Sequence, residues 1–369
     1  MKKNINILLI SSAFYPEISP RSFRASELAK ELTRQGHVVT VISKYRAHDY
    51  TSLLNEFPFQ LKMWKPAAFK PISSIRWLKG TVLDRFLTRI LALLFEYPVI
   101  EEMFRVKHML KKEVGYDLLL SFAVPYPVHW GVAWARKKKH QIAQTWIADC
   151  GDPYMGDRLD SFRKLFYFSY LEKWFCRKAE FITIPVESAI PAYYKEFHHK
   201  IRIIPQGFSF NLNERKNKQP DNNIPHFAYA GGFLAGIRDP RPLLSFLSNL
   251  EEPFRFYVYT NQRELLNDYI PLLGDNLIIS DFIPRDLLMD KLVEMDFLIN
   301  FDNGTTLNVP SKLIDYIITN RPVLNIYYDL NKTNVLEFLK GNYSARMDLP
   351  GPEHYHIEKV VGQFMELKY

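Results

Sequence analysis

The sequence predicts an α/β protein with two doubly wound domains that face each other across a central cleft. Short apolar runs alternate with segments of helical period, and this alternation occurs in two series along the 369 residues. A polar, proline-containing stretch at Asn211–Pro225 separates the two series and is the clearest linker in the chain. The length gives each domain room for its own core. We place the domains at 1–210 and 211–352, and we expect a helix at about 353–369 to pack back onto the first.

The first domain opens with a strand, a helix and a second strand. Ile5–Ser11 is a short apolar run, a segment with apolar residues at helical spacing follows, and Val38–Ser43 is a β-branched run. This order predicts a parallel βαβ unit, in which ligands bind beyond the carboxyl ends of the strands. The candidate binding loop is therefore Ser12–Ser22, with Ser19 and Arg21 as its candidate contact residues.

The remaining strands are predicted from further short apolar runs that alternate with helical segments. In the first series they are Asp117–Ala123, Thr145–Asp149, Phe181–Pro185 and the run that ends at Pro205. In the second series they are 226–231, 254–260, 276–282, 295–301 and 321–328. A long aromatic helix is expected at about Asp160–Lys178, and a shorter helix near Glu187–Phe197.

Composition narrows the class of protein and of partner. With 47% hydrophobic and 24% charged residues the chain is globular, and it is neither disordered nor fibrous. The formal net charge of +8 favours nucleotides, polyanions or an anionic membrane face. The excess of cations is dispersed along the chain, so we do not expect a nucleic-acid partner.

The sequence does not predict a secreted or membrane-spanning protein. The only cysteines, Cys150 and Cys176, cannot form a disulfide framework or a four-ligand zinc site. The apolar start at Ile5–Ile10 lacks a cleavage site, and the longest other apolar stretch, Ile90–Ile100, is shorter than the roughly 20 residues of a membrane helix. We expect a cytoplasmic protein, either soluble or peripheral at the inner face of the cell membrane.

Familiar cofactor motifs are missing from the sequence. The loop after the first strand has no glycine, and the loop after 226–231 does not have the spacing G-x-G-x-x-G. G-x-x-x-x-G-K-[ST] is absent too, which excludes a P-loop enzyme. His198 with His199, and His354 with His356, lack the companions of a metal site. We expect neither a metal nor a cofactor.

Two segments of the second domain are suited to a nucleoside diphosphate. In NVPSKLIDYIITNRPVL, the free amides at a helix start near Ser311, together with Lys312, suit phosphate, and Asp315 suits ribose hydroxyls. The competing interpretation is a capped helix with a solvated lysine and a local ion pair.

In AGGFLAGIRDPRPLL, the glycines Gly231 and Gly232 permit close backbone approach, and Arg238 and Arg241 offer guanidinium groups to phosphate oxygens. The competing interpretation is a flexible loop with solvated arginines.

The first domain offers three more candidates. His129 follows a predicted strand between proline residues, and it is either catalytic or a core histidine. Asp149 and Asp152 stand at the carboxyl end of another predicted strand, where an acceptor has to bind. Aspartates in a turn also serve as helix caps.

The stretch from Lys62 to Lys112 interleaves cations with aromatic residues. Arg85 and Arg89 alternate with Trp77 and Phe86 on predicted helical segments. That mixture is typical of an interfacial membrane contact, and it is also compatible with a core helix that has a basic outer face.

Five segments in consecutive order resemble family 4 glycosyltransferases of the GT-B fold, which is built from two Rossmann-like domains. They are ILLISSAFYPEISPRSFRASELAKELTRQGHVVTVIS, DLLLSFAVPYPVHWGVAWARKK with TWIADCGDPY, IRIIPQGF, YAGGFLAGIRDPRPLL and NVPSKLIDYIITNRPVL. The resemblance covers nearly the whole chain. It implies that Arg238 or Arg241 holds the donor diphosphate with Lys312, that Asp315 holds the ribose, and that His129 is catalytic beside the transferred sugar.

Three positions depart from the family pattern. Asp315 stands where the family usually has glutamate, Leu307 replaces a second carboxylate, and Gly151 replaces an arginine between the two aspartates. Asp315 and Leu307 bear on the identity of the donor and on activity, and Gly151 bears on contacts with the acceptor.

The resemblance implies transfer of a sugar, in the hexosyltransferase class, from a nucleotide-sugar to a glycan or lipid-linked acceptor. It further implies retention of configuration, no essential metal, and a role in surface polysaccharide or glycolipid synthesis. Two alternatives stay open: a non-catalytic nucleotide-sugar-binding homologue or partner subunit, and a sugar-nucleotide epimerase of the same fold.

Overall fold

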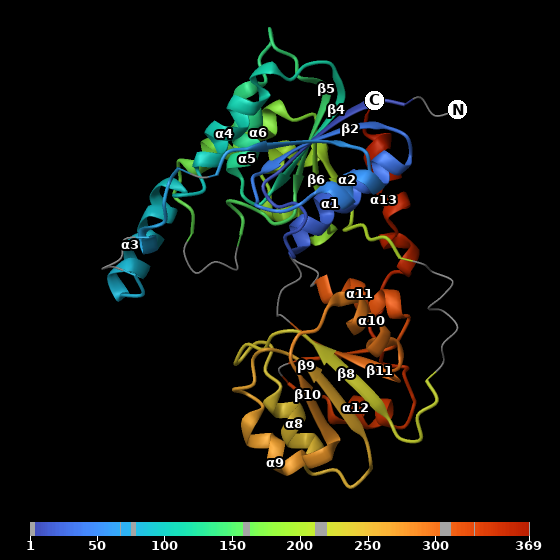
Figure 1. The fold of residues 1–369 in the computed structure, drawn as a ribbon. Coiled ribbons are helices and arrows are strands. Elements are labelled where there is room, and N and C mark those ends of the chain that lie inside the picture. Colours follow the sequence, from blue (N-terminus) through green and yellow to red (C-terminus); the bar gives the residue numbers. More distant parts are fainter. Residues whose placement is uncertain are drawn as a thin grey trace. The chain divides into compact units, whose positions relative to one another are not determined.

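The chain forms two compact α/β units, each built on one parallel sheet. The structure is a computed structural model that describes residues 4–66, 68–74, 79–157, 163–210, 220–302, 311–327 and 329–368. Unit 1 comprises Met1–Ser209 and Tyr355–Tyr369, and unit 2 comprises Phe210–His354. Both sheets are flanked by helices (Figure 1).

Unit 1 contains a seven-stranded parallel sheet in the order β3-β2-β1-β4-β5-β6-β7. Its strands are β1 (Asn6–Ser11), β2 (Val38–Lys44), β3 (Gln60–Trp64), β4 (Tyr116–Ala123), β5 (Ala143–Cys150), β6 (Phe181–Ile184) and β7 (Ile201–Ile203). Its helices are α1 (Pro20–Arg34), α2 (Thr51–Glu56), α3 (Val82–Phe95), α4 (Glu101–Met109), α5 (Pro127–Ala135), α6 (Phe168–Lys178) and α13 (Ile357–Glu366). The strand order reverses between β1 and β4, which defines a topological switch point.

The central unit 1 strands β2, β1, β4 and β5 are buried on both faces, as the near-continuous apolar runs predict. In β1, Leu8 and Ile10 pack into the core beneath α5 and α6, whereas Ile7 and Leu9 pack into the core beneath α1 and α13. Helix α13 contributes Ile357, Val360 and Phe364, among others, to that second core. The C-terminal helix thus closes one face of the unit 1 sheet.

Unit 2 contains a five-stranded parallel sheet in the order β10-β9-β8-β11-β12. Its strands are β8 (His226–Ala230), β9 (Arg255–Tyr259), β10 (Leu277–Ser280), β11 (Phe297–Phe301) and β12 (Val323–Ile326). Its helices are α8 (Arg241–Leu247), α9 (Ile270–Leu273), α10 (Arg285–Val293), α11 (Ser311–Thr319) and α12 (Lys332–Leu339). The order reverses between β8 and β11, so this sheet also has a switch point. The predicted fold class of two doubly wound, Rossmann-like domains is confirmed.

Stacked aromatic rings form much of the unit 2 core. The Phe227 ring stacks on those of Phe256 and Phe297, with centroid separations of 4.8 and 4.7 Å, and Phe338 meets Phe297 edge on. Offset stacking of rings adds to the free energy gained from burying their area. The high phenylalanine content therefore has a packing explanation in this unit.

Several predicted elements differ from the observed ones. Strand β3 was not predicted, because Gln60 and Lys62 interrupt its apolar pattern at the sheet edge. The described part of the long aromatic helix begins only at Phe168, and residues 158–162 lie outside the described residues. In place of one helix near 187–197 there are two short 3₁₀ helices, since Pro191 lacks the N–H that an α-helix needs there. Among the described residues no helix is both long and apolar enough to cross a bilayer.

Glu172 on α6 provides a test of the unit 1 core. Its side chain is 1% exposed, and burial raises its pKa from 4.5 to about 7. Between these two values the native state keeps a proton that the unfolded chain releases, so stability falls as pH rises through this range. Glu172→Gln should abolish this contribution and make the variant more stable than wild type above pH 7, by up to about 3 kcal/mol.

Urea unfolding across a pH series measures the difference in slope between the two proteins. Glu358→Gln, which changes an exposed glutamate on α13, is the matched control and should leave the slope unchanged. Equal slopes for wild type and Glu172→Gln would show that Glu172 titrates normally.

Candidate functional site

The candidate site of unit 2 begins where β8 ends. Gly231 has φ of 151°, a conformation that residues with a Cβ rarely adopt. At Gly232, an added Cβ would lie 2.9 Å from Oε1 of Gln262, and this oxygen accepts a hydrogen bond from the Phe233 N–H at 2.8 Å. Gly231 is thus required by its backbone conformation, whereas a side chain at Gly232 would displace the end of the Gln262 side chain and its hydrogen bond to Phe233. The two glycines bring bare backbone to the carboxyl edge of the sheet.

Two buried tyrosines fix this backbone. The Ala230 N–H donates to the hydroxyl oxygen of Tyr316 on α11 at 2.9 Å, and the Tyr229 hydroxyl donates to the Gly232 carbonyl at 2.7 Å. Tyr316 is fully buried. The end of β8 and the first turns of α11 are therefore joined at the switch point between β8 and β11.

The expected pair Arg238 and Arg241 has a buried carboxylate between its members. Asp239 accepts hydrogen bonds from Nε and Nη2 of Arg241 at 2.9 and 2.5 Å and from the Gly236 N–H at 3.0 Å. Hydrogen bonds from the Arg241 guanidinium lower the pKa of Asp239 to about 2. Arg241 therefore helps to hold this loop, and Arg238 is half-buried beside it.

Asp315 has an ion-pair partner that sequence reasoning missed. Its Oδ1 accepts hydrogen bonds from Nε and Nη2 of Arg285 at 2.8 and 2.6 Å, and both side chains are partly exposed. Arg285 is the first residue of α10 and follows Pro284 after β10. In the sequence, Pro310 likewise stands between a predicted strand and the helix start near Ser311. The order of strand, proline and helix around Pro284 is the sequence signal that could have identified Arg285 as a site residue.

Helix α11 begins at Ser311, so its start lies after β11 as predicted. The side chains of Ser311 and Lys312, and residues 303–310 with Leu307, lie outside the described part of the chain. The described site of unit 2 thus consists of the glycine turn, the arginine loop, the start of α11 and the Arg285–Asp315 pair.

In unit 1, one buried ion pair joins four elements at the carboxyl edge. Nε and Nη2 of Arg24 on α1 each lie 2.6 Å from an oxygen of Asp149, the residue before the last of β5. Arg24 also donates to the carbonyls of Ile204 and Pro205 beyond β7. The Thr183 hydroxyl donates to Asp149 at 2.6 Å. Asp149 is 1% exposed, and these contacts give it a structural role. The expected acceptor contact stays a prediction.

The other acceptor-side candidates lie nearer the surface. Nη2 of Arg21 lies 2.8 Å from Oδ2 of Asp152, and both side chains are exposed. Ser19 is the N-cap of α1, where its hydroxyl oxygen accepts from the Ser22 N–H. Of the four acceptor-side predictions, Arg21 and Asp152 are thus brought together in a solvent-accessible position, and Ser19 has a capping role.

A second polar group near β1 was not predicted. The Ser12 hydroxyl donates to Oε1 of Glu102 on α4 at 2.8 Å, and Lys44 lies 3.3 Å from the same oxygen. Burial raises the pKa of Glu102. Its position on a helix gave no sequence signal, because Glu101 and Glu102 resemble ordinary acidic residues of a first helical turn.

His129 lies in the core of unit 1. It is fully buried on α5, with Nδ1 2.8 Å from the Ser121 hydroxyl and Nε2 3.6 Å from Cys150 Sγ. Ser121 also accepts a hydrogen bond from Trp146 Nε1 at 2.8 Å. Burial lowers the pKa of His129 to about 3. These contacts are those of a neutral core histidine, and the expected contact with a sugar stays a prediction.

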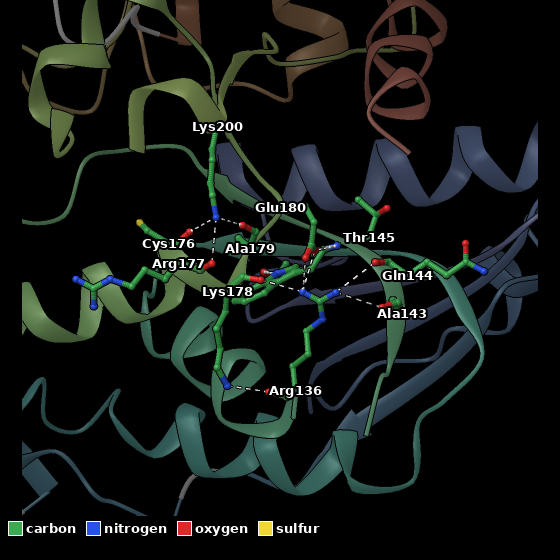
Figure 2. Close-up of polar contacts among 12 residues, drawn as sticks. Arg136, Ala143, Gln144, Thr145, Cys176, Arg177, Lys178, Ala179, Glu180 and Lys200 are labelled. Atoms are coloured by element: carbon green, nitrogen blue, oxygen red, sulfur yellow. Dashed lines mark hydrogen bonds and ion pairs between the residues drawn. The ribbon is translucent and has the colours of Figure 1, made fainter. Parts of the chain in front are cut away.

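A basic cluster lies at the opposite, amino-terminal edge of the unit 1 sheet (Figure 2). Nζ of Lys178, at the end of α6, donates to the carbonyls of Ala133 and Arg136 at the end of α5, at 2.6 and 2.7 Å. Nζ of Lys200 donates to three carbonyls at the end of α6, and Arg136 pairs with Glu180. These cations satisfy carbonyl groups that helix ends leave unpaired, so the cluster is structural.

Similarity to solved structures identifies the architecture as the GT-B fold. A glycosyltransferase from Rickettsia africae ESF-5 matches with a TM-score of 0.64 and 11% identity, over 99% of this chain and 98% of that chain. TarM matches with a TM-score of 0.58 and 9% identity, over 100% and 99%. The lipopolysaccharide outer core galactosyltransferase WaaB, in its apo form, matches with a TM-score of 0.56 and 10% identity, over 98% and 95%. No protein-family model and no curated protein sequence matches the chain.

The two ion pairs of unit 1 make a matched test. Arg24→Met leaves the buried Asp149 without its cation and should lower the free energy of unfolding by about 3–5 kcal/mol. Arg21→Met removes an exposed pair and should cost no more than about 1 kcal/mol. Urea unfolding of both variants measures the difference, and equal losses would contradict the structural role of the Arg24–Asp149 pair.

Proposed function

We propose that this protein is a glycosyltransferase that binds a nucleotide-sugar donor at the carboxyl edge of the unit 2 sheet. One observation carries the proposal: bare glycine backbone after β8 and the start of α11 are joined at the switch point between β8 and β11. In doubly wound sheets this is the place where nucleotides bind. The GT-B fold supports this function by analogy with glycosyltransferases of the same fold.

Each group at this edge has a proposed part in donor binding. The amides at the start of α11 and the Lys312 ammonium receive the diphosphate, and Arg238 adds a second cation. Asp315 accepts hydrogen bonds from the ribose hydroxyls, and Arg285 orients its carboxylate. Arg241 acts on the site through Asp239, by holding the loop that carries Arg238.

The proposed reaction breaks the bond between the sugar C1 and the diphosphate and forms a bond from C1 to an acceptor oxygen. The proton of the acceptor hydroxyl passes to the leaving phosphate. Cations and helix amides stabilise the negative charge that develops on the leaving phosphate, which is the role that a metal has in other transferases. Retention of configuration and transfer of a hexose follow from the family resemblance. We assign the acceptor, a glycan or a lipid-linked sugar, to the Arg21–Asp152 side of unit 1.

A second candidate is a nucleotide-sugar-binding protein without transferase activity. The burial of His129 favours it, and so does Leu307 in place of the usual second carboxylate. Slow hydrolysis of the donor would identify the transferase. An altered sugar-nucleotide without any acceptor product would identify an epimerase.

A thermal-shift screen with UDP-, GDP-, CMP- and dTDP-sugars tests the donor site. A ligand that binds the native state at one hundred times its dissociation constant adds about 2.7 kcal/mol to the free energy of unfolding. It should therefore raise the melting temperature. Asp315→Ala and Arg238→Ala should each weaken affinity for the active nucleotide about tenfold or more, since each removes a charge-assisted hydrogen bond.

Asp281→Ala is the matched control, because Asp281 is an exposed acid of unit 2 that pairs with Arg263. It should leave the affinity unchanged. Unchanged affinity in both Asp315→Ala and Arg238→Ala, or no shift with any of the four nucleotides, would exclude this donor site.

A further inference from the structure

Helix α3 of unit 1 has an inverted burial pattern. Ten of its fourteen residues are apolar, yet the only buried residue of the helix is Asp84. Val82 is 75% exposed, Phe86 is 58% exposed and Phe95 is 59% exposed. Figure 1 shows α3 at a distance from the unit 1 sheet, beyond α4. An apolar helix is ordinarily buried, and a large exposed apolar surface marks a contact site.

The one acid of α3 is removed from the surface by local hydrogen bonds. Asp84 is 7% exposed, and it accepts from the Gly80 N–H at 3.1 Å and from the Thr88 hydroxyl at 3.2 Å. Thr81 caps the same helix start. The arrangement leaves α3 with a surface of apolar side chains and two arginines, Arg85 and Arg89.

The apolar side chains and the arginines share one face. Val82, Phe86, Ile90 and Leu93 recur at intervals of three or four residues and line a shallow groove of about 440 Å³ together with both arginines. Long arginine side chains can lay their methylene groups on an apolar surface while the guanidinium reaches outward. This is the surface of an interfacial amphipathic helix.

The surrounding segment 62–112 exposes positive charge only. Its four acids, Asp84, Glu96, Glu101 and Glu102, are all at most 8% exposed. Its described exposed cations are Lys65, Lys70, Lys79, Arg85, Arg89, Lys111 and Lys112. A surface that combines apolar groups with charge of one sign is complementary to an anionic lipid bilayer.

We propose that α3 and the cationic surface of 62–112, which we call the α3 surface, dock unit 1 on an anionic membrane. Fourteen residues span about 21 Å, less than the roughly 30 Å of a bilayer core, so the helix lies in the plane of the interface. A second copy of this chain is a poorer occupant, because two such surfaces would bring like charges together. The proposal is independent of the function assigned to unit 2.

Co-sedimentation of the full chain with phosphatidylcholine vesicles, with and without phosphatidylglycerol, tests the proposal. Wild type should pellet with the anionic vesicles, and added salt should weaken the binding. Phe86→Ser and Arg85→Glu should each lower the partition coefficient about tenfold, through lost apolar burial and reversed charge respectively. Both side chains are exposed, so the melting temperature should not change.

Two substitutions elsewhere serve as controls. Leu272→Ser changes an apolar residue of α9 that is 63% exposed, and Lys139→Glu makes the same change in net charge away from α3. Both controls should bind vesicles like wild type. The proposal is overturned if wild type does not bind anionic vesicles, or if the α3 variants bind as well as the controls. A dimer in solution that Phe86→Ser dissociates, without vesicle binding, would assign the α3 surface to a second copy.

Discussion

The carboxyl edge of unit 1 depends on a single buried ion pair. Arg24 reaches from α1 to Asp149 at the end of β5, and its remaining donors satisfy carbonyls beyond β7. Two charges are withdrawn from water there, and the bidentate geometry, the hydrogen bond from Thr183 and the bonds of Arg24 to these carbonyls offset the cost of desolvation. The pair fixes α1 over the strand ends, and so it also fixes the start of α1 with its N-cap Ser19 and with Arg21.

The two sheets use the same topology but equip their carboxyl edges differently. In unit 1 the edge is filled by charged side chains that pair with one another, including Glu102 with Lys44. In unit 2 the edge after β8 consists of glycine backbone held by Tyr229 and Tyr316. Backbone amides and a helix start suit a phosphate, whereas a paired polar surface suits hydroxyl groups. This contrast is the physical basis for assigning the nucleotide to unit 2.

The sequence was sufficient for the fold because buried parallel strands are short, near-continuous apolar runs. It failed where the pattern of an element was polar or where the partner of a side chain was remote along the chain. Strand β3 was missed because it lies at the sheet edge with Lys62 in its middle. Arg24 and Arg285 were missed because their partners are distant along the chain, 125 and 30 residues away. His129 was given a catalytic role by resemblance, whereas its burial depends on packing of α5 that no local pattern reveals.

The central claim is that a nucleotide binds at the carboxyl edge of the unit 2 sheet. Hydrogen–deuterium exchange, with and without the nucleotide that gives the largest thermal shift, tests it most directly. We expect slower exchange at Gly231–Phe233, at the start of α10 near Arg285 and in the first turn of α11 from Ser311, with little change in unit 1. Slower exchange confined to unit 1, or to the amino-terminal edge of the unit 2 sheet, would contradict the account.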